Sequence, residues 1–323
     1  MRAKVQSGIA YSSCGIRAII ARAGGVGQGF CRARSGASIC GGPLPPRPQH
    51  VASDAKYAAA TEKHLYLRRV CIYNCNDMTT GYLTATDTDI RPNEVEDDLQ
   101  CQGLRVLQDR NTYCFSSDSA LLANFADFHP GEVGCELCAG SAVVSMLLAV
   151  KTPLRVITAV ELQYPLAERS ARSVARCGLE ERVRIWCGDA KDSVDALGAG
   201  SMDVVVANPP YFRVGDGEMN PVPHVAMCRH ETHITLADVT RVAGRLLRFG
   251  GRFYIVYTAT RLAELFDAMR AASIEPKRLV NVQPAADKAV DTVLVEGRRG
   301  GKSGMAVYNA TRMGLEARFT PKE

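Results

Sequence analysis

Residues 202–211 read MDVVVANPPY, and this stretch decides how the rest of the chain is interpreted. The apolar run Met202–Ala207 predicts a buried strand that stops at Asn208, because two prolines follow at once. Neither Pro209 nor Pro210 carries a backbone N–H, so the turn offers carbonyl oxygens and few donors. Such a turn suits a ligand that donates hydrogen bonds from its own N–H groups.

A planar amino group is the natural guest of this turn. Its two hydrogens are expected to bond to the side-chain oxygen of Asn208 and the carbonyl of Pro209, while the Tyr211 ring covers the flat face beside it. The lone pair of an adenine amine or a carboxamide is delocalised, so acceptors on its hydrogens return electron density to the nitrogen. Orientation and electrostatics then carry most of the rate. We therefore predict that Asn208, Pro209, Pro210 and Tyr211 are catalytic; a rigid turn without a ligand is the alternative.

The chain from about residue 103 alternates strands and helices. This alternation predicts a doubly wound α/β sheet with ligands at the carboxyl ends of its strands. Gly250-Gly251 is expected to end one of the helices. The predicted strands are Val133–Leu137, Arg155–Glu161, Val183–Cys187, Met202–Ala207 and Arg252–Tyr257, with Arg278–Gln283 and Thr292–Glu296 as a closing pair. The predicted helices are Ala142–Val150, Pro165–Cys177, Leu236–Leu247 and Leu262–Ala272.

Acidic residues lie at the ends of three predicted strands. Glu136 begins the small-residue turn 136–142, in which Gly140 lets the backbone approach a ligand ahead of a helix N-terminus. Glu161 is placed to accept both ribose hydroxyls of a nucleoside, and Asp189 to accept from an adenine amino group. Helix capping and a tight turn without a ligand are the alternatives. Three acids followed by the NPPY turn favour a nucleoside-containing cofactor beside an amine-binding pocket.

Charge and cysteine content limit the other classes of function. The net charge of +5 hides a surplus of eight basic residues in 1–77 and of three acidic residues in the remainder, so any RNA contact must come from local patches. There is no apolar run long enough to span a bilayer. The twelve cysteines are scattered, and Cys135 and Cys138 have no second pair or His pair near them. We expect buried thiols, a reducing compartment and no metal.

The chain from about Gln102 to Gly304 resembles the class I S-adenosylmethionine-dependent methyltransferases, and more closely the bacterial tRNA1(Val) adenine-37 N6-methyltransferase family. The segments that carry the resemblance are YCFSSDS at 113–119, LLA at 121–123, the Glu136 turn, NPPYF at 208–212, RHE at 229–231 and RGGKSG at 299–304. It implies a Rossmann-like, mostly parallel sheet with an antiparallel closing strand. It also implies S-adenosylmethionine as cofactor, tRNA as partner and a cytoplasmic enzyme that methylates N6 of adenine 37 in an anticodon loop.

The resemblance also implies a set of site residues. Glu136 and Gly140 would line the methionine end of the cofactor, Glu161 its ribose and Asp189 its adenine. Phe115 and Asp118 would lie on the helix that covers the methyl donor, and Asn208 would border both cofactor and target adenine. The family usually has Asp and three glycines in the first turn, where this chain has Glu136, Cys138 and Ala142. The extra Cβ atoms crowd the backbone approach, and we expect the site to tolerate them.

Further residues are expected to contact the substrate. Phe212, Arg229 and His230 belong to a predicted substrate loop, although His230 fits a structural role equally well. Arg299 and Lys302 begin a basic stretch that suits either an RNA backbone or a solvated terminus. The expected divisions are a disordered or non-native extension over 1–77, the methyltransferase domain over 78–304 and a basic tail over 305–323. The extension reads either as a transit peptide or, as we favour, as a leader before a true start at Met78.

Three other functions stay open at this point. A protein glutamine N5-methyltransferase would use the same NPPY turn, because a carboxamide poses the same chemical problem, but residues 1–102 show no amphipathic helical run of the recognition domain expected there. Ribosomal RNA or DNA adenine is a nearer rival to tRNA. An RNA-binding module that has lost activity through its altered first turn is the third alternative.

Overall fold

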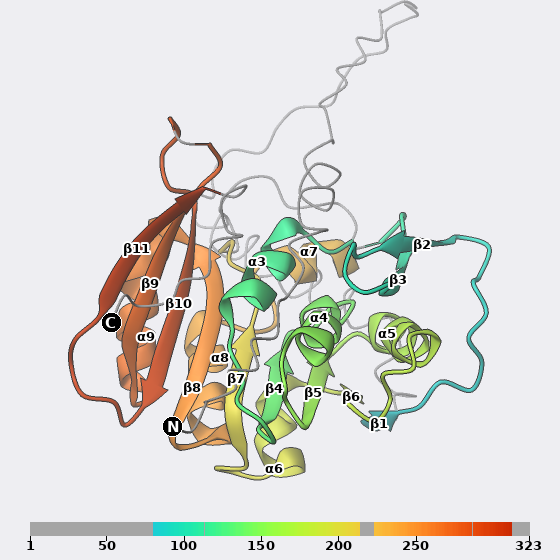
Figure 1. Ribbon diagram of the computed structural model, residues 1–323, viewed down its shortest axis with the longest axis horizontal. Coiled ribbons are helices and arrows are strands. Elements are labelled where there is room, and N and C mark those ends of the chain that lie inside the picture. The colour runs from blue at the N-terminus through green and yellow to red at the C-terminus, as the bar shows by residue number, and fades with distance from the viewer. Residues whose placement is uncertain (1–79, 113, 214–222, 286, 312–323) are drawn as a thin grey trace, which may run out of the picture. The chain divides into compact units, whose positions relative to one another are not determined.

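The computed structural model describes residues 80–112, 114–213, 223–285 and 287–311 (Figure 1). Nine of the described strands form one sheet in the order β1-β6-β5-β4-β7-β8-β10-β9-β11, and β2 and β3 form a separate ribbon. The strands are β1 (Gly81–Leu83), β2 (Glu94–Asp98), β3 (Arg105–Asp109), β4 (Val133–Leu137), β5 (Val156–Glu161), β6 (Val183–Cys187), β7 (Met202–Ala207), β8 (Leu247–Thr258), β9 (Ile274–Gln283), β10 (Thr292–Arg299) and β11 (Ala306–Thr311).

The centre of the sheet is parallel. Strands β6, β5, β4, β7 and β8 all run the same way, and β10 is antiparallel to both of its neighbours, β8 and β9. This confirms the predicted doubly wound sheet with an antiparallel closing strand. The chain moves outward from β4 through β5 to β6 and then returns to β7 on the other side of β4. Such a reversal of strand order opens a crevice at the carboxyl ends of the strands.

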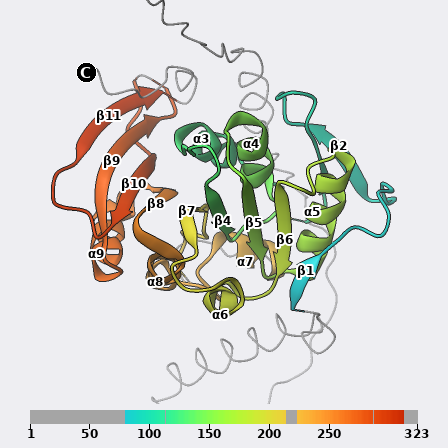
Figure 2. The same ribbon diagram turned by 60° about the horizontal axis from the view of Figure 1, so that its bottom comes forward.

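Helices cover both faces of this sheet (Figure 2). The helices are α3 (Ser117–Phe125), α4 (Val143–Lys151), α5 (Tyr164–Arg176), α6 (Ser193–Leu197), α7 (Pro223–Arg229), α8 (Leu236–Leu246) and α9 (Leu262–Ala271), with 3-10 turns at Ala190–Asp192 and Ala259–Arg261. Helices α3, α4 and α5 lie on one face, and α6, α8 and α9 on the other. Because both faces are covered, central strands such as β5 are buried along their whole length. No described helix has both the length and the apolarity to cross a membrane.

Most predicted elements match the structure to within one residue at each end, but β8 and β9 begin several residues earlier than predicted and β10 ends three residues later. One predicted turn is wrong. Gly250 and Gly251 do not end a helix, because α8 already ends at Leu246 and β8 runs from Leu247 through both glycines. A Cβ atom at Gly251 would lie 2.9 Å from the Arg248 carbonyl oxygen, so Gly251 permits a close backbone approach within the strand, whereas Gly250 has a φ of 77°, in the left-handed region that favours glycine.

Two strands of the sheet and one separate ribbon were not predicted from the sequence. Strand β1 pairs antiparallel with β6, the β2–β3 ribbon packs on α5, and β11 pairs parallel with β9, so the sheet continues past residue 304. The expectations for residues 1–77 lie outside the described residues. Trp186, expected in the core, is 4% exposed. All seven cysteines in the described ranges are free, and Cys135 and Cys187 are fully buried.

Candidate active site

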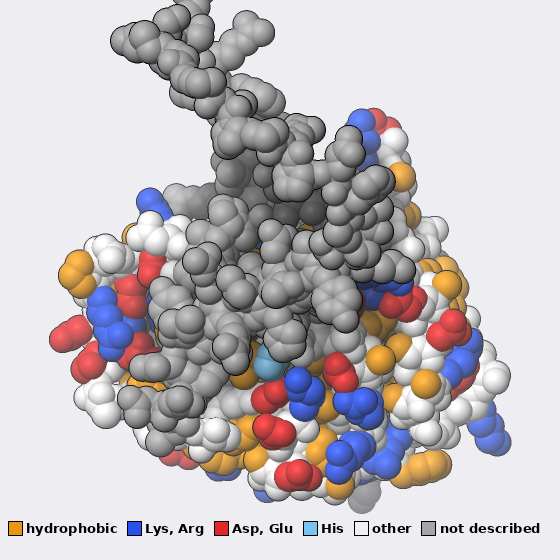
Figure 3. Space-filling view, turned by 180° about the vertical axis from the view of Figure 1, so that it is seen from behind, with side chains coloured by type: hydrophobic (Ala, Val, Ile, Leu, Met, Phe, Trp, Pro, Cys, Tyr) orange, Lys and Arg blue, Asp and Glu red, His pale blue; other side chains and the backbone are white. Residues whose placement is uncertain are grey.

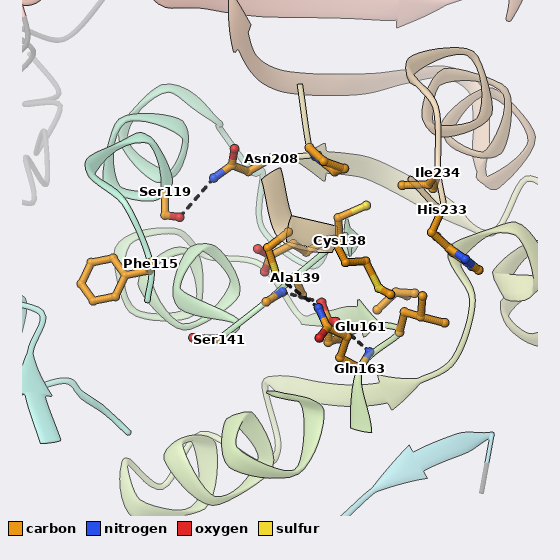
Figure 4. Close-up of a pocket in the computed structure, with 18 of the residues that line it drawn as sticks. Phe115, Ser119, Cys138, Ala139, Ser141, Glu161, Gln163, Asn208, His233 and Ile234 are labelled. Atoms are coloured by element: carbon orange, nitrogen blue, oxygen red, sulfur yellow. Dashed lines mark hydrogen bonds between the residues drawn. The ribbon is translucent and has the colours of Figure 1, made fainter. Parts of the chain in front are cut away.

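A pocket of about 770 Å³, measured to its open mouth, lies at the carboxyl ends of β4, β5, β6 and β7 (Figure 4). Its lining includes seven of the predicted site residues and one further residue of the first turn. These are Phe115, Glu136, Gly140, Glu161, Asp189, Asn208 and Pro210, together with Cys138 from the altered first turn.

The first turn holds its shape through a buried carboxyl group. Glu136 is 1% exposed, and its Oε2 accepts hydrogen bonds from the backbone N–H of Ser145 at 2.9 Å and from the Ser145 hydroxyl at 2.5 Å. Burial raises the pKa of Glu136 to about 8, and these two hydrogen bonds oppose that rise. Glu136 therefore ties the end of β4 to the first turns of α4, which fixes the backbone that borders the pocket.

Glu161 connects the first turn to the second strand. One carboxylate oxygen accepts from the Gly140 N–H and the other from the Gln163 N–H, each at 2.8 Å. Burial raises the pKa of Glu161 to about 7. Each carboxylate oxygen has a second lone pair, so the group can still accept from two vicinal hydroxyls of a ligand. The geometry therefore fits the ribose of a nucleoside.

Asp189 is engaged more fully than the sequence suggests. Its Oδ1 accepts from the Lys191 N–H at 2.9 Å, and its Oδ2 lies 3.0 Å from His233 Nε2 and 3.2 Å from Lys191 Nζ. Burial alone would raise the pKa of Asp189, but the His233 and Lys191 contacts outweigh it and lower the pKa to about 2. A ligand amino group would therefore share this carboxylate with His233.

Asn208 lies where β7 ends, between the sheet and α3. Its Nδ2 donates to the Ser119 hydroxyl at 3.3 Å, and the amide oxygen is directed away from Ser119 (Figure 4). Pro210 lines the pocket, whereas Pro209 is buried and Tyr211 is half-buried against the core. Asn208 thus lines the pocket with its amide nitrogen bound to Ser119, and the binding of a substrate amine by its oxygen stays a prediction.

The rings of Tyr211, Phe212 and His230 lie in contact beside this turn, and we call this row of rings the aromatic step. The Tyr211 ring lies 6.2 Å from the Tyr257 ring and 4.9 Å from the Phe212 ring, and Phe212 lies 5.6 Å from the His230 ring. Phe212 is 42% exposed, whereas His230 is 5% exposed. Backbone hydrogen bonds join Phe212 to residues 229 and 231, so the step is fixed to the end of α7.

A buried ion pair anchors the backbone of the same turn. Arg261 donates to the Tyr211 carbonyl at 2.9 Å and pairs with Glu231 at 3.0 Å. Glu231 also accepts from the Tyr257 hydroxyl at 3.2 Å. The carbonyl of Tyr211 is thus held by the guanidinium group, which fixes the direction of the chain immediately after the NPPY turn.

The remaining predicted residues lie at different distances from the pocket. Asp118 is buried on α3, and Arg229 is exposed at the end of α7; neither is among the lining residues. Arg299 donates to the carbonyl of Leu247, which pairs with Met202 at the beginning of β7. The structure therefore does not bring Arg299 to the pocket but places it at the opposite end of the sheet.

Lys302 lies close to Arg299. Its carbonyl accepts from Lys277 Nζ at 2.9 Å, near the beginning of β9. A contact of Lys302 or Arg299 with a long polynucleotide stays a prediction, but neither residue can reach a base held in this pocket.

Several pocket residues were missed by the sequence analysis. They are Ser119 on α3, Gln163 after β5, Met227 and Cys228 on α7, and His233 and Ile234 before α8. Gln163 donates to the Cys228 sulfur at 3.1 Å, which joins α7 to the cofactor side of the pocket. Ser119 belongs to the segment 113–119 that carries the resemblance, but no role was predicted for it; the other residues belong to no predicted motif, because only the tertiary fold brings them together.

The pocket fits a nucleoside-type cofactor. Apolar side chains such as Val143, Val160 and Ile234 line it, and acids stand at the strand ends where hydroxyl and amino groups need acceptors. Among the described residues, no three His, Cys, Asp or Glu side chains cluster as a metal ion would need.

Known proteins are similar to this chain at low identity, and no family model matches it. It is 26% identical over 211 residues to the tRNA1(Val) (adenine(37)-N6)-methyltransferase of Dickeya chrysanthemi, covering 65% of this chain and 82% of that protein. It is 32% identical over 133 residues to the ribosomal protein uL3 glutamine methyltransferase of Bordetella pertussis, covering 41% of this chain and 42% of that protein. A crystal structure of a predicted O-methyltransferase from Agrobacterium tumefaciens matches 60% of this chain and 86% of that one, with a TM-score of 0.49 and 17% identity.

The strand order, the acid-lined crevice and the two methyltransferases that are similar in sequence agree on one class of enzyme. The chain is a class I S-adenosylmethionine-dependent methyltransferase, with S-adenosylmethionine as its cofactor. Within that class it resembles the tRNA1(Val) (adenine(37)-N6)-methyltransferases, as the motifs had indicated.

Proposed function

We propose that this enzyme methylates N6 of an adenine in a tRNA anticodon loop, at position 37, in the cytoplasm. The observation that carries the proposal is the place of Asn208 in the lining of the acid-lined pocket, with its amide nitrogen bound to Ser119 and its oxygen turned away from that residue (Figure 4). An adenine amine needs an acceptor for its hydrogens and a ring for its face; the Asn208 oxygen suits the first role, and the Tyr211 ring, which follows the same turn, suits the second.

The geometry of the pocket supports the cofactor assignments that the resemblance implies. Glu161 would accept from the ribose hydroxyls, Asp189 with His233 would meet the adenine, and Glu136 and Gly140 would shape the backbone at the methionine end. When bound, S-adenosylmethionine supplies an electrophilic methyl group. The task of the protein is to hold the amine in line with that group and to exclude water.

The exposed aromatic step favours a nucleic acid over a protein substrate. Phe212 is 42% exposed and stands in line with Tyr211, so a base splayed from its stack can lie on Tyr211 while a neighbouring base contacts Phe212. Methylation of a glutamine carboxamide is the second candidate, because the uL3 glutamine methyltransferase is similar over the part of the chain that it matches.

Substitution of Asn208 tests the proposal. Asn208→Ala removes the acceptor and should lower kcat by about 10²–10³-fold, the usual effect of losing one such group, with little change in cofactor affinity. Methyl transfer from labelled cofactor into total tRNA, followed by nucleoside analysis, measures the first effect, and calorimetry measures the second. Asn281→Ala, on β9 where the side chain bonds to Asn309, is a matched control that should leave kcat unchanged.

Nucleoside analysis also decides between the candidates. N6-methyladenosine in the tRNA fraction supports the proposal. Methylglutamine in a protein fraction with unmodified tRNA contradicts it, and near-normal turnover of Asn208→Ala contradicts the role assigned to the amide.

A further inference from the structure

The pocket contains one polar contact that the assignments above do not use. Ser119 on α3 is 6% exposed, and its hydroxyl accepts the hydrogen bond from Asn208 Nδ2. The two residues are 89 positions apart in sequence and lie on different walls of the pocket (Figure 4). The contact therefore joins α3 directly to the end of β7.

The chemistry of the amide gives this contact a consequence. A carboxamide side chain can turn by a half-rotation that exchanges its oxygen and its NH2 group with little change in shape. Only one of the two orientations directs the amide oxygen toward a substrate amine. In the other, the amide NH2 group would face the substrate NH2 group, and two donors cannot bond to each other. The productive orientation directs Nδ2 into a half-buried place, where it needs an acceptor.

Ser119 supplies that acceptor. Among the residues that the structure describes, no donor bonds to Asn208 Oδ1, so the oxygen is left for a ligand. In this structure the hydroxyl accepts from Nδ2, which holds the amide with its oxygen turned away from Ser119. Without the hydroxyl, the amide nitrogen would lose this partner and the side chain would be freer to turn away from the orientation that offers its oxygen to a substrate.

We propose that Ser119 is a positioning residue that holds the Asn208 amide with its oxygen toward the substrate amine. The proposal rests on the proposed function in that it takes an NH2-bearing group as the substrate. Ser119 itself need not touch the reacting atoms. It acts before the chemical step, by raising the fraction of enzyme in which the acceptor already faces the amine.

Substitution on α3 tests this role. Ser119→Ala should lower kcat about tenfold, the loss expected for one hydrogen bond, while KM for tRNA and the affinity for S-adenosylmethionine stay within about twofold. Ser119→Thr keeps the hydroxyl and should recover most of the loss. Ser117→Ala makes the same change two residues earlier on α3, outside the pocket lining, and should leave kcat unchanged.

A double-mutant cycle separates positioning from packing. Once Asn208 is replaced by Ala, adding Ser119→Ala should change kcat by less than about twofold, because there is no amide left to orient. A tenfold loss in both backgrounds, or an equal loss of cofactor affinity, would show that Ser119 supports the fold instead and would overturn the proposal.

The cycle also keeps the two proposals distinguishable. If the wild-type enzyme methylates protein glutamine and not tRNA, the proposed function fails. The same cycle run on that protein still tests Ser119, because a carboxamide offers the same NH2 group. Coupling between Ser119 and Asn208 would then support the positioning role, and additivity would refute it.

Discussion

Backbone strain is concentrated in the first turn of the pocket. Cys138, Gly140 and Ala142 have φ angles of 59°, 55° and 54°, in the left-handed region that favours glycine. Two of these three residues nevertheless carry a Cβ atom. The left-handed conformation costs such residues about 1–2 kcal/mol each. The turn therefore keeps the backbone conformation that suits glycine, although Cys138 and Ala142 stand where the family has glycine.

A glycine in this turn should stabilise the protein, against the usual trend. Ala142→Gly relieves the left-handed strain and should raise the free energy of unfolding by about 1 kcal/mol, or the melting temperature by about 2–4 °C. Ala149→Gly in the middle of α4 should lower the stability by about 1 kcal/mol, the ordinary cost of a helical glycine. Thermal melting measures both. Destabilisation by Ala142→Gly would show that the turn is not strained.

Pocket residues at the ends of strands could be predicted from the sequence, whereas pocket residues that tertiary packing brings to those strand ends could not. Glu136, Glu161 and Asn208 each end a buried strand, and strand ends share one edge of a parallel sheet, so their meeting could be predicted. The contact of Ser119 with Asn208 and the position of His233 could not be predicted. Ser119 belongs to the segment 113–119, but nothing local indicates that tertiary packing brings it to Asn208, and no local pattern marks His233.

At the scale of the elements, a buried charge network fastens the β2–β3 ribbon to α5. The Arg172 guanidinium bonds to both carboxylate oxygens of Glu94, at 2.6 and 2.8 Å, and the two side chains are only 1% and 5% exposed. Arg169 adds a bond to Glu94 at 3.1 Å. Periodicity did not predict this ribbon, because β2 reads EVEDD, with four acids that pattern analysis assigns to a solvated loop.

Removing one partner of this network should be costly. Arg172→Ala leaves Glu94 buried with Arg169 alone and should lower the free energy of unfolding by about 3 kcal/mol. Arg245→Ala breaks the Arg245–Asp195 pair, whose side chains are more than half exposed, and should change stability by at most about 1 kcal/mol. Urea unfolding of the two variants measures the difference, and equal effects would mean that the ribbon is held by apolar packing alone.

At the scale of the whole molecule, charges of both signs are interspersed over the described part of the face shown in Figure 3. Stability should therefore depend on pH mainly through individual buried carboxyl groups. Glu94 and Asp189 have pKa values near 2, so their stabilisation is present above pH 4.5 and is lost as the pH falls toward 2. Glu136 and Glu161 act in the opposite direction, because their pKa values rise from an ordinary 4.5 to about 8 and about 7.

The folded protein thus binds protons on Glu136 and Glu161 more tightly than the unfolded chain does. Its free energy of unfolding should fall as the pH rises from about 5 to about 8, by a few kcal/mol, with the maximum near pH 5. Urea unfolding at pH 5.5 and 8.0 without cofactor measures this fall. Glu136→Gln and Glu161→Gln each keep a neutral side chain at both pH values and should flatten the dependence, whereas exposed Glu180→Gln should not. A dependence that stays equally steep in both variants would mean that these carboxyls are already ionised in the folded enzyme.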